Sequence, residues 1–339
     1  MSTKANATLP RVGVGALGGT IAMAEVHSEV KGAQPAFGAE QLISAIPAIK
    51  NHALIDAETI ANVASPSVTI EHILEAKRFA EGCVEEGAAG VVLTHGTDTL
   101  EETAFLLDLL WAHSQPLIVT GAMRTATAVS ADGPANLYNS ILAAADPTLR
   151  DFGVCVCLDD AIFQAKSVTK TDANTTWTFQ SPSWGPIARI LEENIRTVHQ
   201  PRPNRQTFVL PEHPEPIDIP ILEIGIDTNP AYLSLLAAAS PQGIVLSCPG
   251  MGHIPERMIP ALEQVLQQGI PVVVATRSPG GSTGTHTYSY PGAEVDLIDR
   301  GAILAGFISA RKARLLLWAA LQSGTTNAKL AALFKAIDV

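Results

Sequence analysis

Two threonines, an aspartate and a lysine are the side chains of this 339-residue chain best suited to catalysis. Thr20 follows a pair of glycines, whose lack of side chains lets a ligand approach its hydroxyl. Thr97 and Asp98 follow the apolar run 90–94. A threonine hydroxyl is a weak nucleophile until a base removes its proton, and Lys170 is the best candidate base, because a desolvated lysine titrates low enough to accept one. A hydrolase built on threonine would need such a base near the hydroxyl.

Each of these residues also has a plainer structural interpretation. Taken alone, Thr20 is a turn residue, Asp98 caps a helix and Lys170 is a solvated surface lysine. Thr20 and Thr97 are each expected in a turn at the end of a strand of the same sheet, and we call these turns the first and second hydroxyl corners. The presence of the second corner favours a catalytic role for both threonines. A carboxylate such as Asp98 beside a pocket also suits the ammonium group of a ligand.

The corner at Thr97 is predicted to join a buried strand, 91–94, to a helix, 99–113. The helix is predicted because apolar residues recur at a spacing of three to four positions, and because Thr99 and Glu102 have the spacing of a capping box. Open α/β sheets bind their ligands at such corners, where backbone N–H groups are unpaired. Lys170 is expected in a loop of hydroxyl residues after the fifth strand.

Apolar runs alternate with helical patterns along the chain, which predicts an α/β fold. Further strands are predicted at 12–16, 117–120, 154–158, 219–224, 243–247 and 271–275, and further helices at 69–86, 134–145, from about 230, at 254–268 and twice near the end. The expected organisation is a larger N-terminal parallel-sheet α/β domain (1–200), a Pro-rich linker (201–218) and a smaller C-terminal α/β domain (219–339).

Composition excludes several function classes. Lys and Arg number 22 against 33 Asp and Glu, a net charge of −11, so the basic footprint of a nucleic-acid partner is missing. No apolar run approaches a membrane span, and a cytoplasmic location is the expectation. Four cysteines are too few for a disulfide framework. Cys155 and Cys157 are interpreted as buried hydrophobes, as are Cys83 and Cys248, and no metal site is expected.

The glycines of the first strand offer a competing interpretation. Gly13, Gly15 and Gly18 match the dinucleotide-binding spacing G-x-G-x-x-G. That fingerprint needs a helix directly after the third glycine to hold the pyrophosphate. Here the segment 25–35 is polar, contains glycine and ends in proline, which predicts a loop, so dinucleotide binding is disfavoured.

Several segments together carry a resemblance to a known family over almost the whole chain. They are Gly-Gly-Thr-Ile-Ala at 18–22, His-Gly-Thr-Asp-Thr-Leu-Glu-Glu-Thr-Ala at 95–104, Gly-Ala-Met-Arg at 121–124, Ser-Ala-Asp-Gly-Pro-Ala-Asn-Leu at 130–137 and Val-Thr-Lys-Thr at 168–171. In order and spacing they resemble the bacterial-type L-asparaginases, a family that includes the glutaminase-asparaginases. The second segment is long and specific.

The resemblance implies hydrolysis of the side-chain amide of L-asparagine to L-aspartate and ammonia, through an acyl-threonine intermediate and without a cofactor. Thr20 would be the nucleophile, and Thr97 with Lys170 a second hydroxyl–base pair. Asp98 would bind the substrate ammonium and Ser65 its carboxylate. The backbone around Thr97 and Ala122 would support the amide and its oxyanion.

The resemblance also implies a homotetramer in which the C-terminal domain of one subunit supplies Glu294 to the site of another. The chain departs from the family in three places. It has no tyrosine between 20 and 42, where the family commonly carries one on a mobile loop beside the nucleophile, so Tyr288 or Tyr290 is hypothesised to supply that hydroxyl. His253 stands where asparagine is usual, and Pro66 where glutamine is common. These last two bear on the choice between asparagine and glutamine.

Three alternatives remain beside an asparaginase. One is a glutaminase-asparaginase with broader amide specificity. Another is the ammonia-releasing subunit of an archaeal amidotransferase, which normally carries an extra domain ahead of the Gly-Gly-Thr segment, whereas only a short leader is expected here. The third, from a different class, is a catalytically silent amino-acid-binding protein, although a binder has no need of two hydroxyls and a base.

Overall fold

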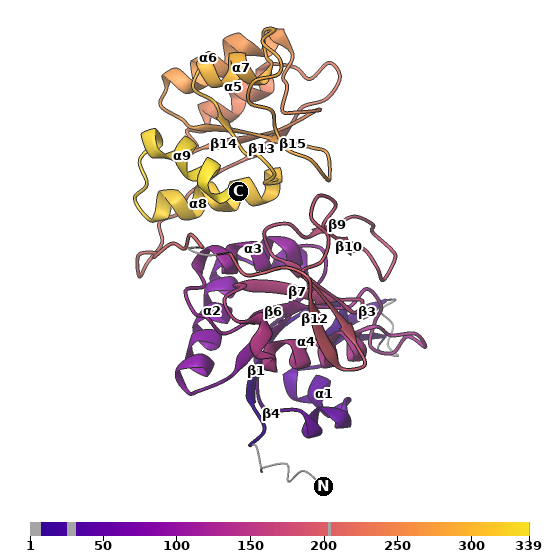
Figure 1. Cartoon of the computed structure of the whole chain (residues 1–339). Coiled ribbons are helices and arrows are strands. Elements are labelled where there is room, and N and C mark those ends of the chain that lie inside the picture. The colour runs from indigo at the N-terminus through magenta and orange to yellow at the C-terminus, as the bar shows by residue number, and fades with distance from the viewer. Residues whose placement is uncertain (1–7, 26–31, 203–204, 339) are drawn as a thin grey trace. The chain divides into compact units, whose positions relative to one another are not determined.

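The computed structural model describes residues 8–25, 32–202 and 205–338, and the chain divides into two compact units, Met1–Arg205 and Gln206–Val339 (Figure 1). Each unit is an α/β fold with its own hydrophobic core. In the part of the chain that the structure describes, no helix is long and apolar enough to cross a membrane.

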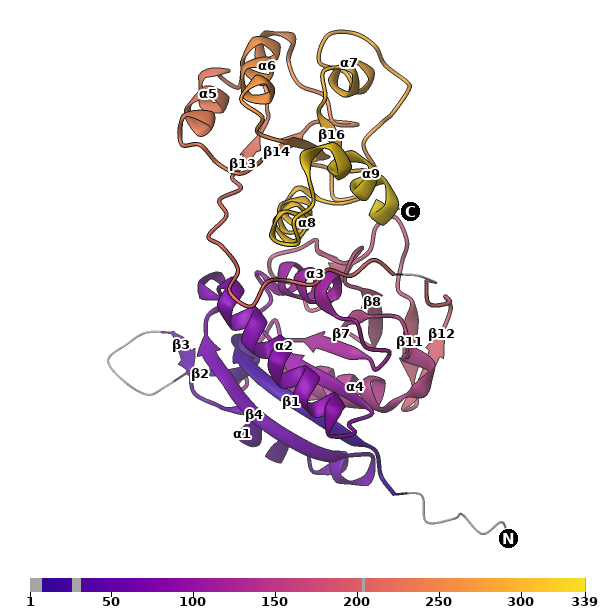
Figure 2. The same cartoon turned by 90° about the vertical axis from the view of Figure 1, so that its left-hand side faces the viewer.

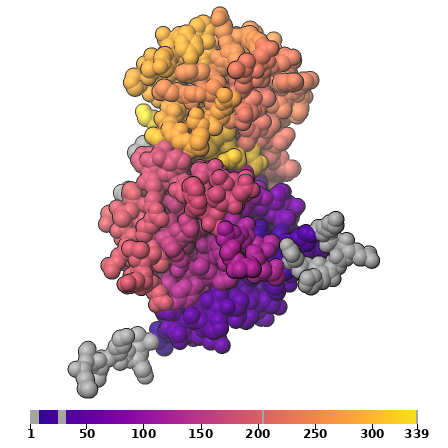
Figure 3. All heavy atoms as spheres, turned by 90° about the vertical axis from the view of Figure 1, so that its right-hand side faces the viewer, coloured from indigo at the N-terminus to yellow at the C-terminus, as the bar shows by residue number. Residues whose placement is uncertain are grey.

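An eight-stranded sheet forms the N-terminal unit. Its strands, in spatial order, are β12 (Asn194–Thr197), β11 (Ala188–Leu191), β8 (Ala161–Gln164), β7 (Val154–Leu158), β6 (Leu117–Thr120), β5 (Gly90–Thr94), β1 (Arg11–Gly18) and β4 (Leu54–Val63). The five strands from β7 to β4 pair in parallel, as the sequence predicts, whereas β8, β11 and β12 add antiparallel pairs. In Figure 3 the indigo atoms from the start of the chain and the pink-to-red atoms near residues 160–200 gather on different sides of this unit.

Helices cover both faces of this sheet, because its central strands are apolar on both sides. Helices α1 (Ala39–Ser44) and α4 (Gly133–Ala145) pack on one face, against alternate residues of β1 such as Val12 and Val14. Helices α2 (Ile70–Glu85) and α3 (Leu100–Leu110) lie on the other.

The glycines of β1 serve this packing. A Cβ built on Gly13 would lie 2.6 Å from Sγ of Cys83, and one on Gly15 would lie 2.9 Å from the ring of Phe79, both on α2. After β1 the chain makes only the short 3₁₀ helix η1 (Thr20–Ala22) before β2 (Met23–Glu25). The helix that a dinucleotide fingerprint requires does not follow Gly18.

The segment predicted as a loop at 25–35 contains structure at both ends. Strand β2 pairs antiparallel with β3 (Ala33–Pro35), and residues 26–31 between them lie outside the described residues. The loop prediction was therefore wrong for Glu25 and for Ala33–Pro35, because strands of three residues are too short to show an alternating pattern in the sequence.

The C-terminal unit is a smaller parallel sheet of β13 (Ile221–Glu223), β14 (Ile244–Cys248), β15 (Val272–Thr276) and β16 (Ile303–Leu304). Within this unit, α5 (Ala231–Ala238) and α6 (Ile259–Gln267) lie on one face, and α8 (Ala310–Gln322) lies on the other, followed by α9 (Asn327–Asp338) (Figure 2). The helix predicted at 254–268 begins only after the 3₁₀ turn η5 (Glu256–Met258), and the short helix α7 (Glu294–Asp299) was not predicted.

All four cysteines are free. Cys155, Cys157 and Cys248 are buried, as interpreted from the sequence, and burial raises the pKa of the Cys157 thiol to about 12. Cys83 differs, since its side chain is only partly buried against β1. Cysteines with such raised pKa values are poor nucleophiles, so they offer no competing catalytic group.

Candidate active site

The first hydroxyl corner is built on two glycines with left-handed backbone, Gly18 at φ 101° and Gly19 at φ 83°. They turn the chain so that Thr20, half-buried, begins η1 at the end of β1. A Cβ on Gly19 would lie 2.2 Å from Cα of Gly96. The corner at Thr20 therefore packs backbone to backbone against the turn that carries Thr97, which only glycine permits.

The second corner lies between β5 and α3. Its turn is held to the chain after β4 by Ser65, whose Oγ accepts a hydrogen bond from the Asp98 amide at 3.2 Å and whose carbonyl accepts one from the Thr99 hydroxyl at 2.8 Å. Ser65 is buried, and its own O–H proton is left to donate elsewhere.

The predicted capping box at this corner was wrong. Thr99 does occupy the N-cap of α3, but its side chain makes no hydrogen bond to the helix amides. The hydroxyl donates to Ser65 instead, a residue 34 positions away. A long-range contact thus takes the group that local spacing assigns to the helix.

Lys170 joins the second corner. Its Nζ donates to Oγ1 of Thr97 at 3.0 Å and to Oδ1 of Asp98 at 2.7 Å. The Lys170 side chain is 16% exposed and that of Asp98 62%, so the carboxylate remains open to a ligand while the lysine is largely enclosed. Because the lysine donates to Thr97, the Thr97 hydroxyl is free to donate its own proton.

Lys170 lies in a short strand rather than in the predicted loop. Strand β9 (Thr169–Lys170) pairs antiparallel with β10 (Phe179–Gln180). The Lys170 amide also donates to Oε2 of Glu101 at 2.6 Å. Glu101 was not among the predicted site residues, and no signal in the acidic first turn of α3, which it shares with Glu102, marks it as the buried one.

The loop at Ala122 lies beside the second corner, since a Cβ on Gly121 would lie 3.4 Å from Cγ2 of Thr97. The amides of Met123 and Arg124 donate to the two carboxylate oxygens of Asp132, each at 2.9 Å. Ala122 itself is fully buried. The two hydrogen bonds therefore tie the loop after Ala122 to the N-cap residue of α4.

His95 is a second residue that the sequence analysis missed. It is fully buried, with Nδ1 2.7 Å from the Gly96 carbonyl and Nε2 3.0 Å from Oγ1 of Thr103 on α3. A carbonyl only accepts, so Nδ1 carries the proton and Nε2 accepts from Thr103. Burial lowers the pKa of His95 to about 4, although the bond to Gly96 acts in the opposite direction. A neutral imidazole thus ties the turn before Thr97 to α3.

Replacing His95 by glutamine is expected to remove part of the pH dependence of stability. The unfolded chain protonates this histidine near pH 6.5 and the folded chain only near pH 4, so stability is lost as the pH falls through that window. For the wild type this contributes a loss of about 2 kcal/mol between neutral pH and about pH 4.5, measurable by urea unfolding. The exposed His213→Gln variant serves as control. An unchanged pH dependence in His95→Gln would refute the assignment.

Glu294, Tyr288 and Tyr290 lie in the C-terminal unit and meet His253 there. The Glu294 carboxylate is fully buried, and its Oε1 accepts the amides of Thr287 and Tyr288, both at 2.7 Å. Burial alone would raise the pKa of Glu294. The hydrogen bonds from these amides, and the contact between Nε2 of His253 and Oε2 of Glu294 at 3.0 Å, outweigh burial and hold the pKa below its usual range. The hydroxyl of Tyr290 lies 2.8 Å from Nδ1 of His253.

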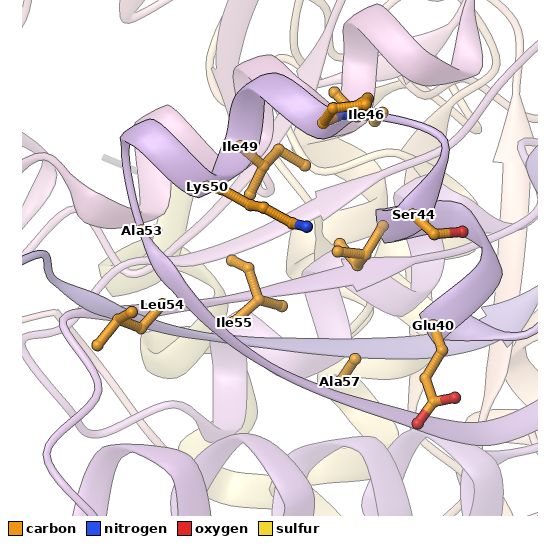
Figure 4. A pocket seen from close by; sticks show the side chains of 11 residues that line it. Glu40, Ser44, Ile46, Ile49, Lys50, Ala53, Leu54, Ile55 and Ala57 are labelled. Carbon is orange, nitrogen blue, oxygen red and sulfur yellow. The ribbon is translucent and has the colours of Figure 1, made fainter.

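A separate pocket of about 670 Å³ opens between α1 and β4, away from both corners (Figure 4). Its floor is apolar, with Ile49 and Ile55, and Lys50 and Glu40 stand at its sides. None of the predicted site residues lines it. Among the described residues, no cluster of His, Cys, Asp or Glu could hold a metal ion.

The chain matches known proteins over most of its length. Residues 11–203 match the family model described as "Asparaginase, N-terminal", and residues 218–334 match "Glutaminase/Asparaginase C-terminal domain". The chain is 35% identical to a probable periplasmic L-asparaginase of Haemophilus influenzae, over 93% of this chain and 89% of that protein. It is 31% identical to a glutaminase-asparaginase of Pseudomonas fluorescens, over 96% and 90%.

A solved structure agrees with these matches. The crystal structure of a probable cytoplasmic L-asparaginase from Campylobacter jejuni superposes with a TM-score of 0.85 at 29% identity, over 96% of this chain and 99% of that one. Two family models, relatives above 30% identity and the fold lead to one conclusion. The chain belongs to the asparaginase family.

Proposed function

We propose that the protein is an L-asparaginase, which hydrolyses L-asparagine to L-aspartate and ammonia. One observation carries the proposal: Lys170 donates to both Thr97 and Asp98, on a turn that packs directly against the glycines before Thr20. Two hydroxyls, a base and an open carboxylate at the ends of neighbouring strands form the set that amide hydrolysis needs. The names of the relatives support the same substrate class.

In this mechanism Thr20 Oγ attacks the side-chain amide carbon, the proton that its hydroxyl loses passes to the amide nitrogen, and the C–N bond breaks to release ammonia. The resulting acyl-threonine is hydrolysed by water that Thr97 and Lys170 activate. The exposed carboxylate of Asp98 binds the substrate ammonium, and Ser65 donates its free hydroxyl proton to the substrate carboxylate. The backbone at Thr97 and Ala122 supports the oxyanion, a contribution often worth about 3 kcal/mol.

Glutamine is the second candidate substrate. A relative of 31% identity is named a glutaminase-asparaginase. In this chain Pro66 follows the carboxylate-binding Ser65, and His253 meets Glu294, so the two family departures lie beside proposed substrate contacts. A pocket discriminates ligands that differ by one methylene by only about 1–3 kcal/mol, so partial glutaminase activity is expected.

The direct test is ammonia release from L-asparagine and L-glutamine, measured side by side on the wild-type protein. We expect release from both, with kcat/KM higher for asparagine by roughly 10- to 200-fold. A protein that binds aspartate yet releases no ammonia from either amide would be the silent amino-acid binder instead. Release from glutamine at the higher rate would make it a glutaminase first.

We also infer a homotetramer in which the C-terminal unit of one subunit completes the site of another, and a cytoplasmic location in keeping with four free cysteines. Shared sites predict complementation between two inactive chains, Thr20→Ala and Glu294→Gln. In hybrids assembled at random from equal amounts, about a quarter of the sites contain both intact residues, so about a quarter of wild-type activity should return. Co-expression with two affinity tags and assay of the doubly purified fraction measures this. Hybrids no more active than their parents would show that each subunit carries a complete site.

A further inference from the structure

Lys170 is held at both ends by one short segment of the chain. Its Nζ donates to Thr97 and Asp98 at 3.0 and 2.7 Å, and its backbone amide donates to Oε2 of Glu101 at 2.6 Å. These three partners lie within residues 97–101, whereas Lys170 lies 69 positions beyond Glu101. The segment therefore fixes the backbone that carries the lysine as well as its amine.

The backbone amide of Lys170 is available to Glu101 because of the register between β9 and β10. Lys170 lies opposite Phe179. The next residue, Thr171, donates its amide to the Thr178 carbonyl at 2.8 Å. In an antiparallel ladder only alternate residues exchange hydrogen bonds with the partner strand, so the Lys170 amide points away from β10. It points instead to α3, where the Glu101 carboxylate accepts it.

Strand β9 gains little stability from strand pairing. It consists of two residues and pairs with β10 in a two-stranded sheet, separate from the eight-stranded sheet whose strand β5 leads to Thr97. An isolated pair of strands is only marginally stable in water. The bond to Glu101 ties this pair to α3, and so to the second hydroxyl corner.

The Glu101 carboxylate has a fixed position. Glu101 is 2% exposed and is the second residue of α3. The first turn of this helix is held at two further points. Thr103 contacts Nε2 of His95 at 3.0 Å, and Thr99 donates to the Ser65 carbonyl at 2.8 Å. A buried carboxylate is stable only where it accepts hydrogen bonds, and the first turn of a helix favours its negative charge. Glu101 thus offers the β9 backbone an acceptor that the rest of the corner holds in place.

We propose that Glu101 is a positioning residue for catalysis: by accepting the Lys170 amide, it sets the 3.0 Å distance from Nζ to the Thr97 hydroxyl. This inference rests on the proposed function, in which Thr97 and Lys170 activate the water that hydrolyses the acyl-threonine. In this role Glu101 contacts neither substrate nor water and acts only through Lys170. A shift of about 1 Å in a reacting group can lower a rate by about 10²-fold, so a displaced strand β9 is enough to impair turnover.

The placement of Lys170 can be measured without turnover. In NMR spectra of lysine-labelled protein, the Lys170 signals are assigned by their loss in Lys170→Arg. A hydrogen bond of 2.6 Å to a carboxylate should give an amide proton at low field that exchanges slowly with solvent. In Glu101→Leu we expect this proton to move to higher field and the Nζ signal to shift as well. An Nζ signal that stays the same in Glu101→Leu would overturn the proposal, because the amine would then be placed independently of Glu101.

Kinetics tests the role in catalysis. We expect Glu101→Leu to lower kcat for L-asparagine by about 10²-fold with little change in KM, because Ser65 and Asp98 still bind the substrate. Glu101→Gln should recover most of this loss, since its amide oxygen accepts the same hydrogen bond. The matched control is Glu71→Gln, at an exposed glutamate in the second position of α2, which should keep full activity. Thermal unfolding confirms that each variant is folded. Equal kcat values for wild type and Glu101→Leu would contradict the proposal.

A double variant separates positioning from general support of the fold. If Glu101 acts only through Lys170, adding Glu101→Leu to Lys170→Met should lower kcat no further. Two losses that multiply would show that Glu101 acts on another group, and the proposal would be wrong. A wild type with the expected Lys170 signals that releases no ammonia from L-asparagine would instead refute the proposed function, while the placement of Lys170 by Glu101 would stand.

Discussion

Replacing Thr20 by alanine is expected to lower kcat for L-asparagine by about 10⁴-fold while the protein still binds L-aspartate. The reason is covalent: without Oγ no acyl-enzyme can form, and activation of water by Thr97 and Lys170 has no intermediate to act on. The fold should be unaffected, since the turn is set by Gly18 and Gly19 rather than by the threonine side chain. Ammonia release and isothermal titration with aspartate measure the two quantities.

Thr20→Ser supplies the matched control, because it keeps a hydroxyl at the same backbone position. We expect it to retain part of the activity and, like the wild type, to form aspartyl hydroxamate when hydroxylamine replaces water as the acceptor. The alanine variant should form none. Alanine and wild-type proteins with equal turnover would mean that Thr20 is only a turn residue and that another group attacks the amide.

The sheet was predictable where strands are buried on both faces. Strands β5, β6 and β7 lie close to their predicted limits because every one of their residues is buried, so each appears in the sequence as a continuous apolar run. Strand β4 is the longest of the N-terminal sheet and was not predicted. It is an edge strand whose acidic and polar residues face outward, so it has no apolar run to reveal it.

The candidate site was predictable only as far as its residues adjoin strand ends. Thr20, Thr97 and Asp98 follow apolar runs and were found from that placement. The residues that hold them in place come from distant parts of the chain. Lys170 bonds Glu101 at a separation of 69 residues, and the Thr99 hydroxyl, which local spacing assigned to a helix cap, donates to Ser65 instead. Spacing rules describe contacts within a few residues, so these partners appear only once the chain is folded.

The C-terminal cluster illustrates the same limit. The sequence placed Tyr288 and Tyr290 a few residues before Glu294 and left the choice between the two tyrosines open. His253, 41 positions from Glu294, contacts both the Glu294 carboxylate and the Tyr290 hydroxyl, and no sequence pattern pairs these residues. A residue that departs from the usual asparagine is therefore the link between the tyrosine and the carboxylate.

Replacing Lys170 by methionine is expected to lower kcat for L-asparagine by about 10³-fold. Methionine keeps much of the apolar stem but loses both hydrogen bonds, to Thr97 and to Asp98, so the Thr97 hydroxyl loses the amine beside it and Asp98 its cationic neighbour. The exposed Lys50→Met is the control for removing a positive charge from the same unit. Steady-state kinetics on both variants, with unfolding curves, gives the comparison.

Arginine at position 170 separates the two functions of the lysine. Its guanidinium retains the charge that faces Asp98 but does not give up a proton at any working pH. If Lys170 is the base for Thr97, Lys170→Arg should be as inactive as Lys170→Met, although its KM should stay closer to that of the wild type because Asp98 keeps a cationic neighbour. Recovery of kcat in Lys170→Arg would mean that the charge alone is needed, and the base for the second hydroxyl would then have to be another group.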